Sequence, residues 1–287
     1  MMNLPTLVGF DDLEFHYNPR VAVPEAPALL GACAARGAAA RAAHPPASLR
    51  YGPHPRETID LVVPACARAT LVFIHGGYWR ALSKEHFSWI APPWAAAGVA
   101  TANVEYPLCP EVTVADIAAA ARRALAALLE APARPAGPIV VAGHSAGGYL
   151  AAELMTGHWP APPPLAGVLA ISGVFDPAPL LATSINADIR LDAAAAAALN
   201  LLTRAPSVAA PLALSVGGDE PAGFQAQTEA LARAWAGLAP ARPALPGRNH
   251  FTAVDALAEP GSALWDWVAA RIGQIGPDGG FACNMAI

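Results

Sequence analysis

A serine between small residues stands in the segment Gly143-His144-Ser145-Ala146-Gly147. A β-rich run, Ile139-Val140-Val141, comes directly before it, and a helix-compatible run follows. This G-x-S-x-G pattern between a strand and a helix is typical of a nucleophile elbow, in which a sharp turn exposes the serine hydroxyl. The turn strains the serine backbone, and small neighbours avoid steric clashes there. The segment predicts Ser145 as a nucleophile for acyl transfer.

A second glycine-containing loop, His75-Gly76-Gly77, follows an apolar run at residues 70–74. Acyl transfer places negative charge on the carbonyl oxygen, and backbone N–H groups that approach closely can stabilise this charge. We expect these N–H groups to come from Gly76, Gly77 and Ala146, the residue after the nucleophile. His75 is expected to orient the loop by hydrogen bonding.

A catalytic serine needs a general base, and two histidines follow Ser145 in the chain. His158 comes too early, just after the predicted elbow helix. His250 lies between the last expected strand and the last helix, where the base belongs if the order is serine, acid, histidine. The sequence therefore predicts His250 as the base.

The base in turn needs an orienting carboxylate. Asp219 follows a predicted strand and two glycines that permit a sharp turn, and this order favours it as the acid. The adjacent Glu220 and the earlier Asp176 are the alternatives.

Aromatic residues adjoin the predicted oxyanion loop. Tyr78 and Trp79 follow Gly77 directly, and we expect at least one of them to line the substrate pocket. Glu105 ends another predicted strand and is expected to support the site rather than react.

The elements that must position these residues alternate between strand and helix. This order predicts an α/β fold, with a parallel sheet covered by helices on both faces. We expect one domain over residues 1–275, with a helical lid or insertion at 176–211 and a flexible tail at 276–287. Expected strands cover 57–63, 70–74, 99–104, 138–142, 165–171, 212–216 and 242–245; expected helices cover 114–129, 146–156, 224–235 and 253–272, the last broken near Pro260; residues 11–55 are expected to form helices and loops.

Composition narrows the function further. The 287 residues carry a formal net charge of −5 without a basic cluster, which argues against nucleic-acid binding. The sequence shows neither a signal peptide nor a membrane span, so a cytoplasmic protein is expected. No metal-ligand spacing or cofactor fingerprint occurs, and the four cysteines are expected to be reduced thiols. The expected partner is a small-molecule substrate, and a homodimer stays open.

Together, His75-Gly76-Gly77-Tyr78-Trp79 and the elbow segment resemble kynurenine formamidase (arylformamidase), a family related to the hormone-sensitive-lipase-like esterases. Those esterases usually carry a third glycine where Tyr78 stands. Tyr17-Asn18-Pro19-Arg20, Ser184-Ile185-Asn186 and Arg190-Leu191-Asp192 also look like bacterial members.

The resemblance implies the α/β-hydrolase fold, a triad of Ser145, Asp219 and His250, and oxyanion donors at Gly76, Gly77 and Ala146. Around Glu220 the chain is one residue longer than the family pattern. The implied reaction is hydrolysis of an aryl formamide such as N-formylkynurenine through an acyl-serine intermediate, without a cofactor. A short-chain carboxylesterase is the alternative, and a non-catalytic binding protein of the same fold is a more distant one.

Overall fold

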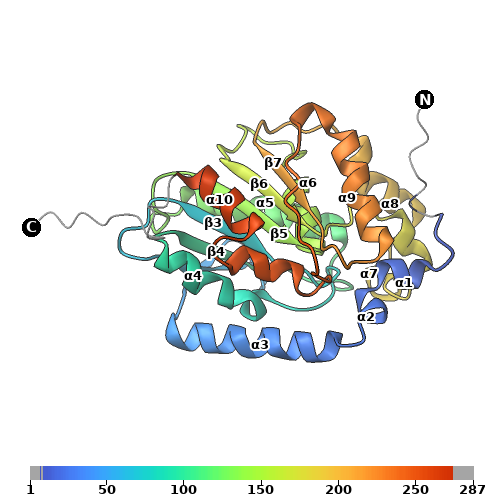
Figure 1. The fold of residues 1–287 in the computed structure, drawn as a ribbon. Helices are drawn as coiled ribbons and strands as arrows, with labels where there is room; N and C mark the ends of the chain where they lie inside the picture. The colour runs from blue at the N-terminus through green and yellow to red at the C-terminus, as the bar shows by residue number, and fades with distance from the viewer. Residues whose placement is uncertain (1–6, 8, 274–287) are drawn as a thin grey trace, which may run out of the picture.

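The computed structural model describes residue 7 and residues 9–273, which are built around one seven-stranded sheet (Figure 1). The strand order is β1-β2-β4-β3-β5-β6-β7. Strands β4, β3, β5, β6 and β7 are mutually parallel, whereas β2 runs antiparallel to both β1 and β4. The strands are β1 (Ala47–Arg50), β2 (Thr58–Val62), β3 (Thr70–Ile74), β4 (Ala100–Val104), β5 (Ile139–His144), β6 (Gly167–Ile171) and β7 (Leu212–Ser215).

Helices cover both faces of the sheet, and each face has its own apolar core. One core contains α5 (Val114–Glu130), α6 (Ala146–Glu153) and α9 (Ala222–Ala234). The other contains the 3₁₀ helices η1 (Lys84–Ile90) and η5 (Ala253–Ala258), together with α4 (Ala91–Ala96) and α10 (Ala263–Ile272). Figure 1 shows α4 and α10 on the near side of the strands. The sheet is therefore the middle layer of three.

The remaining helices lie at the periphery. The N-terminal segment forms α1 (Leu13–Tyr17), α2 (Pro19–Ala22) and the long α3 (Ala26–Ala43), which runs along the outside of the molecule (Figure 1). Helix α3 packs closely on η1 at Gly37, where a Cβ atom would lie 2.1 Å from the carbonyl oxygen of Glu85. Short helices fill the segment between β6 and β7: η2 (Ala178–Ala182), α7 (Asn186–Ile189), α8 (Ala193–Leu199) and η3 (Leu201–Thr203); η4 (Ala236–Leu238) follows α9.

Strands β3, β4, β5 and β6 are buried along their whole length. Continuous apolar runs suit such strands, because a parallel sheet covered on both faces has no solvent-facing side. The register pairs Ile74 with Gly143 and His144 with Ile171, so the carboxyl ends of β3, β5 and β6 meet at one edge. The residues that follow these strands are therefore neighbours in space.

The predicted alternation of strands and helices matches the structure, with three exceptions. The helices η1 and α4, between β3 and β4, were not predicted. The short strand β1 was not predicted, because three of its four residues are exposed and it lacks an apolar pattern. The strand predicted at 242–245 was wrong: Ala241 and Leu245 form only isolated bridges to Ala213 and Gly217.

Two other expectations concern the cysteines and the chain end. Cys33 and Cys109 are free thiols as expected, but Cys66 is disulfide-bonded, which corrects the prediction of a reduced thiol there. The tail predicted at 276–287, including Cys283, lies outside the described residues. Within the described part of the chain, no helix has the length and apolar character needed to cross a membrane.

Candidate active site

Ser145 occupies a strained turn between β5 and α6, with φ 57° and ψ −120°. A Cβ atom at Gly143 would lie 2.0 Å from the carbonyl oxygen of Gly147, and one at Gly147 would lie 2.0 Å from that of Ile74. Both glycines of the motif are therefore required by close backbone contact. The Ser145 N–H donates to the Ile171 carbonyl at 2.8 Å, which anchors the turn to β6.

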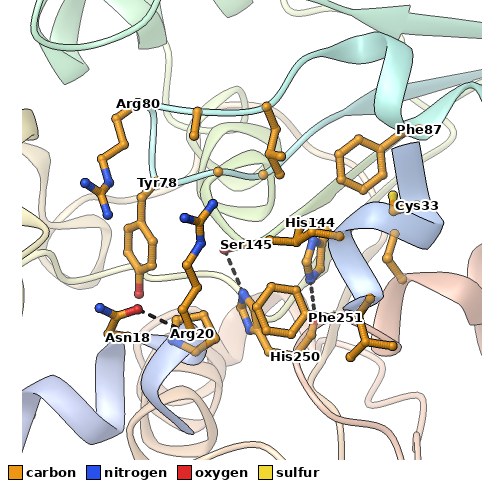
Figure 2. Close-up of a pocket in the computed structure, with 18 of the residues that line it drawn as sticks. Asn18, Arg20, Cys33, Tyr78, Arg80, Phe87, His144, Ser145, His250 and Phe251 are labelled. Carbon is orange, nitrogen blue, oxygen red and sulfur yellow. Dashed lines mark hydrogen bonds between the residues drawn. The ribbon is translucent and has the colours of Figure 1, made fainter. Parts of the chain in front are cut away.

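His250 faces this serine across the pocket (Figure 2). Its Nε2 lies 3.0 Å from Ser145 Oγ, and the two residues are only 2% and 3% exposed. The ring of Phe224 packs on the imidazole with centroids 4.4 Å apart. The Asn249 side chain accepts hydrogen bonds from the N–H groups of Phe251 and Thr252, which holds the loop around His250. The structure thus brings together the serine and histidine that the sequence predicted.

The carboxylate at His250 belongs to Glu220. Its Oε2 lies 2.7 Å from His250 Nδ1. Its Oε1 accepts hydrogen bonds from the Ser172 hydroxyl and, at 2.7 Å, from the Gly217 N–H. The carboxylate is therefore fixed on both oxygens and can hold one orientation of the imidazole.

The prediction of Asp219 as the carboxylate partner of His250 is wrong in this geometry. After β7 the chain turns, with the Glu220 N–H donating to the Gly217 carbonyl at 3.1 Å and the Asp219 N–H to the Arg248 carbonyl at 3.0 Å. This turn buries Glu220 and leaves Asp219 exposed. The other alternative, Asp176, accepts instead from the Ala178 N–H at 3.0 Å, and burial raises the pKa of its carboxyl.

The loop Gly76-Gly77 lies directly against the nucleophile. A Cβ atom at Gly76 would lie 2.9 Å from the His144 carbonyl oxygen and 3.0 Å from Ser145 Cβ. Gly77 has φ +113°, and a Cβ atom there would lie 2.1 Å from the Ala81 carbonyl oxygen. The N–H groups of Gly76, Gly77 and Ala146 donate no hydrogen bond to any described residue. They are thus available beside Ser145 for an oxyanion.

His75 lies behind this loop, as expected of an orienting residue. It is fully buried, its Nε2 lies 3.1 Å from Glu105 Oε1, and its ring stacks on Tyr106 at 4.2 Å. Burial alone would raise the pKa of the Glu105 carboxyl, but His75, the Arg56 guanidinium and the Lys84 N–H together hold it below its ordinary value. Glu105 is therefore an ionised carboxylate that supports the loop through its contact with His75.

His144, the residue before the nucleophile, is also buried. Its Nε2 donates to the His250 carbonyl at 2.8 Å, while its Nδ1 has no hydrogen-bond partner among the described residues. Burial and the neighbouring His250 hold the pKa of His144 well below its ordinary value. His144 is thus a neutral donor that ties the His250 backbone to the elbow.

The pocket over Ser145 receives one of the two predicted aromatic residues. Tyr78 lines it, with its hydroxyl hydrogen-bonded to the Tyr17 carbonyl. Trp79 does not line it: it is fully buried and packs edge-on against Tyr149 of α6 at 5.4 Å, so Tyr78 alone meets the expectation that at least one of the two lines the pocket. The other lining residues around Ser145 and His250 come mostly from α2, α3, η1, η5 and nearby loops: Asn18, Pro19, Arg20, Leu29, Leu30, Cys33, Gly76, Gly77, Arg80, Ala81, Leu82, Phe87, His144, Asp188, Phe251 and Val254.

Sequence reasoning missed several of these residues. From the predicted lid at 176–211, only Asp188 lines the pocket, whereas Asn18, α2 and α3 supply six residues. The lid role of 176–211 stays a prediction. Ser172, which holds Glu220, carried no motif, although its φ of 54° marks a special turn after β6. Arg20 belongs to the segment Tyr17-Asn18-Pro19-Arg20, which resembles the family but was not predicted to line the substrate pocket.

Side chains that could bind a metal ion are a separate question from the catalytic contacts. Across residue 7 and residues 9–273, no three His, Cys, Asp or Glu side chains gather as ligands for a metal ion. The chemistry that the described side chains offer is nucleophilic attack by a hydroxyl with an adjacent imidazole and carboxylate.

Known proteins resemble this chain in sequence and in structure. The kynurenine formamidases of Salmo salar and Danio rerio are 26% and 24% identical to it, over 73% and 78% of this chain and 76% and 80% of those proteins. A proposed thioesterase from Silicibacter sp. TM1040 superimposes with a TM-score of 0.77 at 30% identity, covering 91% of this chain and 98% of that one. Esterase B from Lactobacillus rhamnosis shares the fold, with a TM-score of 0.65 and 20% identity over 87% of this chain and 95% of that one.

The model of the alpha/beta hydrolase fold matches residues 71–237, which is more than half of the chain and includes β3, the elbow and the turn at Glu220. The predicted fold class is thereby confirmed. The chain belongs to the alpha/beta hydrolase family, and the protein is a hydrolase.

Proposed function

We propose that the protein is a serine hydrolase in which Ser145 attacks a small acyl amide or ester. The observation that carries this proposal is the continuous hydrogen-bonded chain from Ser145 Oγ through His250 to Glu220. His250 is the general base, and Glu220 fixes its tautomer and stabilises the imidazolium that forms. Glu220 therefore replaces Asp219 in the triad that the sequence predicted.

The first half of the reaction forms an acyl-serine. The Ser145 Oγ proton passes to His250 Nε2 as Oγ attacks the carbonyl carbon. The resulting oxyanion accepts hydrogen bonds from the N–H groups of Gly76, Gly77 and Ala146. Collapse of this intermediate breaks the bond to the leaving amine or alcohol, which takes the proton from His250.

The second half releases the acyl group. A water molecule gives a proton to His250 Nε2 and attacks the acyl carbon, and the same N–H groups stabilise the second oxyanion. Cleavage of the Oγ–acyl bond returns the proton to Ser145 and frees a carboxylic acid. With a formamide, the products are formate and an amine, and no cofactor enters the balance.

The substrate we propose is an aryl formamide such as N-formylkynurenine. Two kynurenine formamidases are similar to this chain over about three quarters of their length, which supports this choice. The apolar residues Leu30, Phe87 and Phe251 on the pocket wall also suit an aromatic leaving group. A carboxylesterase is the second candidate, because the Silicibacter protein at 30% identity is described as a thioesterase, and esters follow the same steps.

Covalent labelling tests the mechanism. A fluorophosphonate probe should label the wild-type protein and Ser184→Ala, but not Ser145→Ala. Ser184 is a matched control, because it is exposed and its hydroxyl contacts the Glu14 carboxylate, yet it lacks an adjacent imidazole in the described structure. Ser145→Ala should also lower kcat by about 10⁴-fold or more while the fold persists. Labelling of folded Ser145→Ala at the wild-type rate would place the reactive nucleophile elsewhere and refute the role of Ser145, whereas no labelling of the folded wild-type protein would favour a non-catalytic binding protein.

Turnover tests the substrate. Hydrolysis of N-formylkynurenine and of phenyl acetate is measured on one preparation of the enzyme. We expect kcat/KM for N-formylkynurenine to equal or exceed that for phenyl acetate. Rapid cleavage of phenyl acetate without detectable formamide cleavage would establish the carboxylesterase instead.

A further inference from the structure

Arg20 is a cationic side chain in the wall of the pocket that contains Ser145 and His250. In Figure 2 its side chain extends into the pocket between Tyr78 and His250. We infer that Arg20 binds a carboxylate carried by the leaving group, so that the preferred substrate is an aryl formamide or aryl ester whose leaving group bears a carboxylate. This inference rests on the proposed function and specifies a further feature of its substrate, a carboxylate on the leaving group.

The backbone at Arg20 is held in place from two sides. The Asn18 side chain caps α2 by accepting from the Arg20 N–H at 3.2 Å, and Pro19 fixes the first helical position. One residue earlier, the Tyr17 carbonyl accepts from the hydroxyl of Tyr78, which follows the oxyanion glycines. The guanidinium is thus attached to a segment tied directly to the loop beside the nucleophile.

The positive charge of Arg20 is not balanced by a carboxylate of the residues that line this pocket. Arg80, the other arginine in the wall, forms an ion pair with Asp188, which lines the same pocket. Arg20 forms no ion pair and no side-chain hydrogen bond with the residues that the structure describes. Glu220 does not compensate it, since that carboxylate is buried behind His250 and bonded to it.

The rest of the pocket supports a binding mode with two contacts. Figure 2 shows Phe87 and Cys33 on one side of Ser145, and Arg20, Asn18 and Arg80 on the other. When the aryl ring of the leaving group packs on the apolar side, a substituent of that ring points toward the polar side. Because a guanidinium presents paired donors that match a carboxylate, a carboxylate there gains charge-assisted hydrogen bonds that a neutral substituent does not.

The experiment compares substrates with and without a carboxylate on the leaving group. Phenyl acetate is compared with 3- and 4-acetoxybenzoate, and N-formylkynurenine with its methyl ester. These five aryl esters and formamides share the acyl-transfer step, so the change that an Arg20 variant makes in the kcat/KM ratio between members with and without a carboxylate measures recognition of that group. We expect the wild-type enzyme to prefer N-formylkynurenine to its methyl ester, and at least one of the acetoxybenzoates to phenyl acetate.

Arg20→Gln removes the charge while keeping a polar, though shorter, side chain. We expect it to lower kcat/KM for the substrates that carry a carboxylate by about tenfold or more, mainly through KM, because a charge-assisted hydrogen bond is lost. For phenyl acetate and the methyl ester, which lack a carboxylate, kcat/KM should change by less than about twofold, as expected of a substitution that removes no contact. Arg20→Lys should retain part of the preference. Arg68→Gln is the matched control, since Arg68 is exposed and precedes the opposite end of β3.

The outcomes separate this inference from the proposed function. Equal losses of kcat/KM on substrates with and without a carboxylate in Arg20→Gln, or no loss on either, would overturn the role of Arg20 while leaving the hydrolase intact. If N-formylkynurenine is not cleaved but an acetoxybenzoate is preferred in an Arg20-dependent way, the formamide proposal fails and the carboxylate site stands. An enzyme inactive toward every ester and formamide of the set would overturn both.

Discussion

Glu220 Oε2 lies 2.7 Å from His250 Nδ1, and this contact is enclosed: the side chains of both residues are 3% exposed or less. The other carboxylate oxygen is occupied by the Ser172 hydroxyl and the Gly217 N–H. A buried carboxylate held in this way cannot rotate to another partner without losing charge-assisted hydrogen bonds. The orientation of His250 toward Ser145 therefore depends on Glu220.

Replacing Glu220 by Gln tests this dependence. The amide is similar in shape, but it can present an N–H to His250 Nδ1 and favour the wrong tautomer, so we expect kcat to fall by about 10³–10⁴-fold. Asp219→Asn is the matched control at the neighbouring, exposed position and should keep kcat within about twofold of the wild type. Steady-state kinetics with phenyl acetate, together with circular dichroism to verify folding, measures both. A severe loss in Asp219→Asn with an active Glu220→Gln would return the acid to Asp219.

The elbow at Ser145 could be predicted from sequence because its cause is local and steric. Gly143 and Gly147 are imposed by backbone atoms 2.0 Å from where a Cβ would lie, so the motif itself encodes the turn. His250 could be predicted from its place in the chain order. The loops at the carboxyl ends of parallel strands meet at one edge of the sheet, so a histidine after the last strand lies near the serine after β5.

The position of the acid could not be predicted in the same way. Whether Asp219 or Glu220 points inward depends on where the turn after β7 closes, and the carbonyls of Leu245 and Arg248 fix this by accepting from Gly218 and Asp219. These contacts join segments almost thirty residues apart, and no local pattern reports them. Trp79 is a similar case, since its burial depends on Tyr149 of α6 rather than on the adjacent glycines.

Gly76 is predicted to tolerate no side chain. A methyl group there would lie 3.0 Å from Ser145 Cβ and 2.9 Å from the His144 carbonyl oxygen, so the loop must shift and its N–H groups move away from the oxyanion. We expect Gly76→Ala to lower kcat by about 10²–10³-fold, the usual cost of a lost oxyanion donor. Gly237→Ala is the control, because a Cβ atom there meets nothing within 4 Å. Wild-type kcat in Gly76→Ala would exclude this loop from the oxyanion site.

His144 should make stability depend on pH. Its pKa in the folded protein lies well below the value of 6.5 for an unperturbed histidine, because it is buried beside His250. Above pH 6.5 it is neutral in both the folded and the unfolded state, and its pKa shift has no effect on stability. Below pH 6.5 the unfolded chain binds the proton first, so folding loses up to about 1.4 kcal/mol per pH unit.

The variant His144→Gln keeps a side-chain donor and removes this titration. We expect the unfolding free energy of the wild type to fall more steeply than that of the variant between pH 6.5 and pH 5.5. Urea denaturation of both proteins at several pH values measures the difference, in which the histidines that do not contact His144 cancel. A difference between the two proteins that stays constant over this range would show that His144 is protonated in the folded state as readily as in the unfolded one.

The last prediction concerns the size of the acyl group. Tyr78 lines the pocket next to the oxyanion glycines, with its hydroxyl held on the Tyr17 carbonyl, so its ring takes up space beside Ser145 that a third glycine would leave open. We therefore expect kcat/KM to fall from formyl to acetyl to butyryl on a common aryl leaving group. Size discrimination of this kind is worth about 1–3 kcal/mol per methylene, so short esters should still react.

Tyr78→Gly tests the cause of this order, and its backbone is compatible with glycine because φ at residue 78 is 49°. The variant should raise the butyryl-to-acetyl ratio of kcat/KM by about tenfold if the ring limits the acyl group. Tyr78→Phe keeps the ring and removes the hydroxyl, so it should leave the ratio near the wild-type value and serves as the control. The ratio, measured for three proteins on one ester series, does not depend on how much of each preparation is active. A wild-type enzyme that prefers butyryl to acetyl, with the same ratio in Tyr78→Gly, would show that Tyr78 does not bound the acyl site.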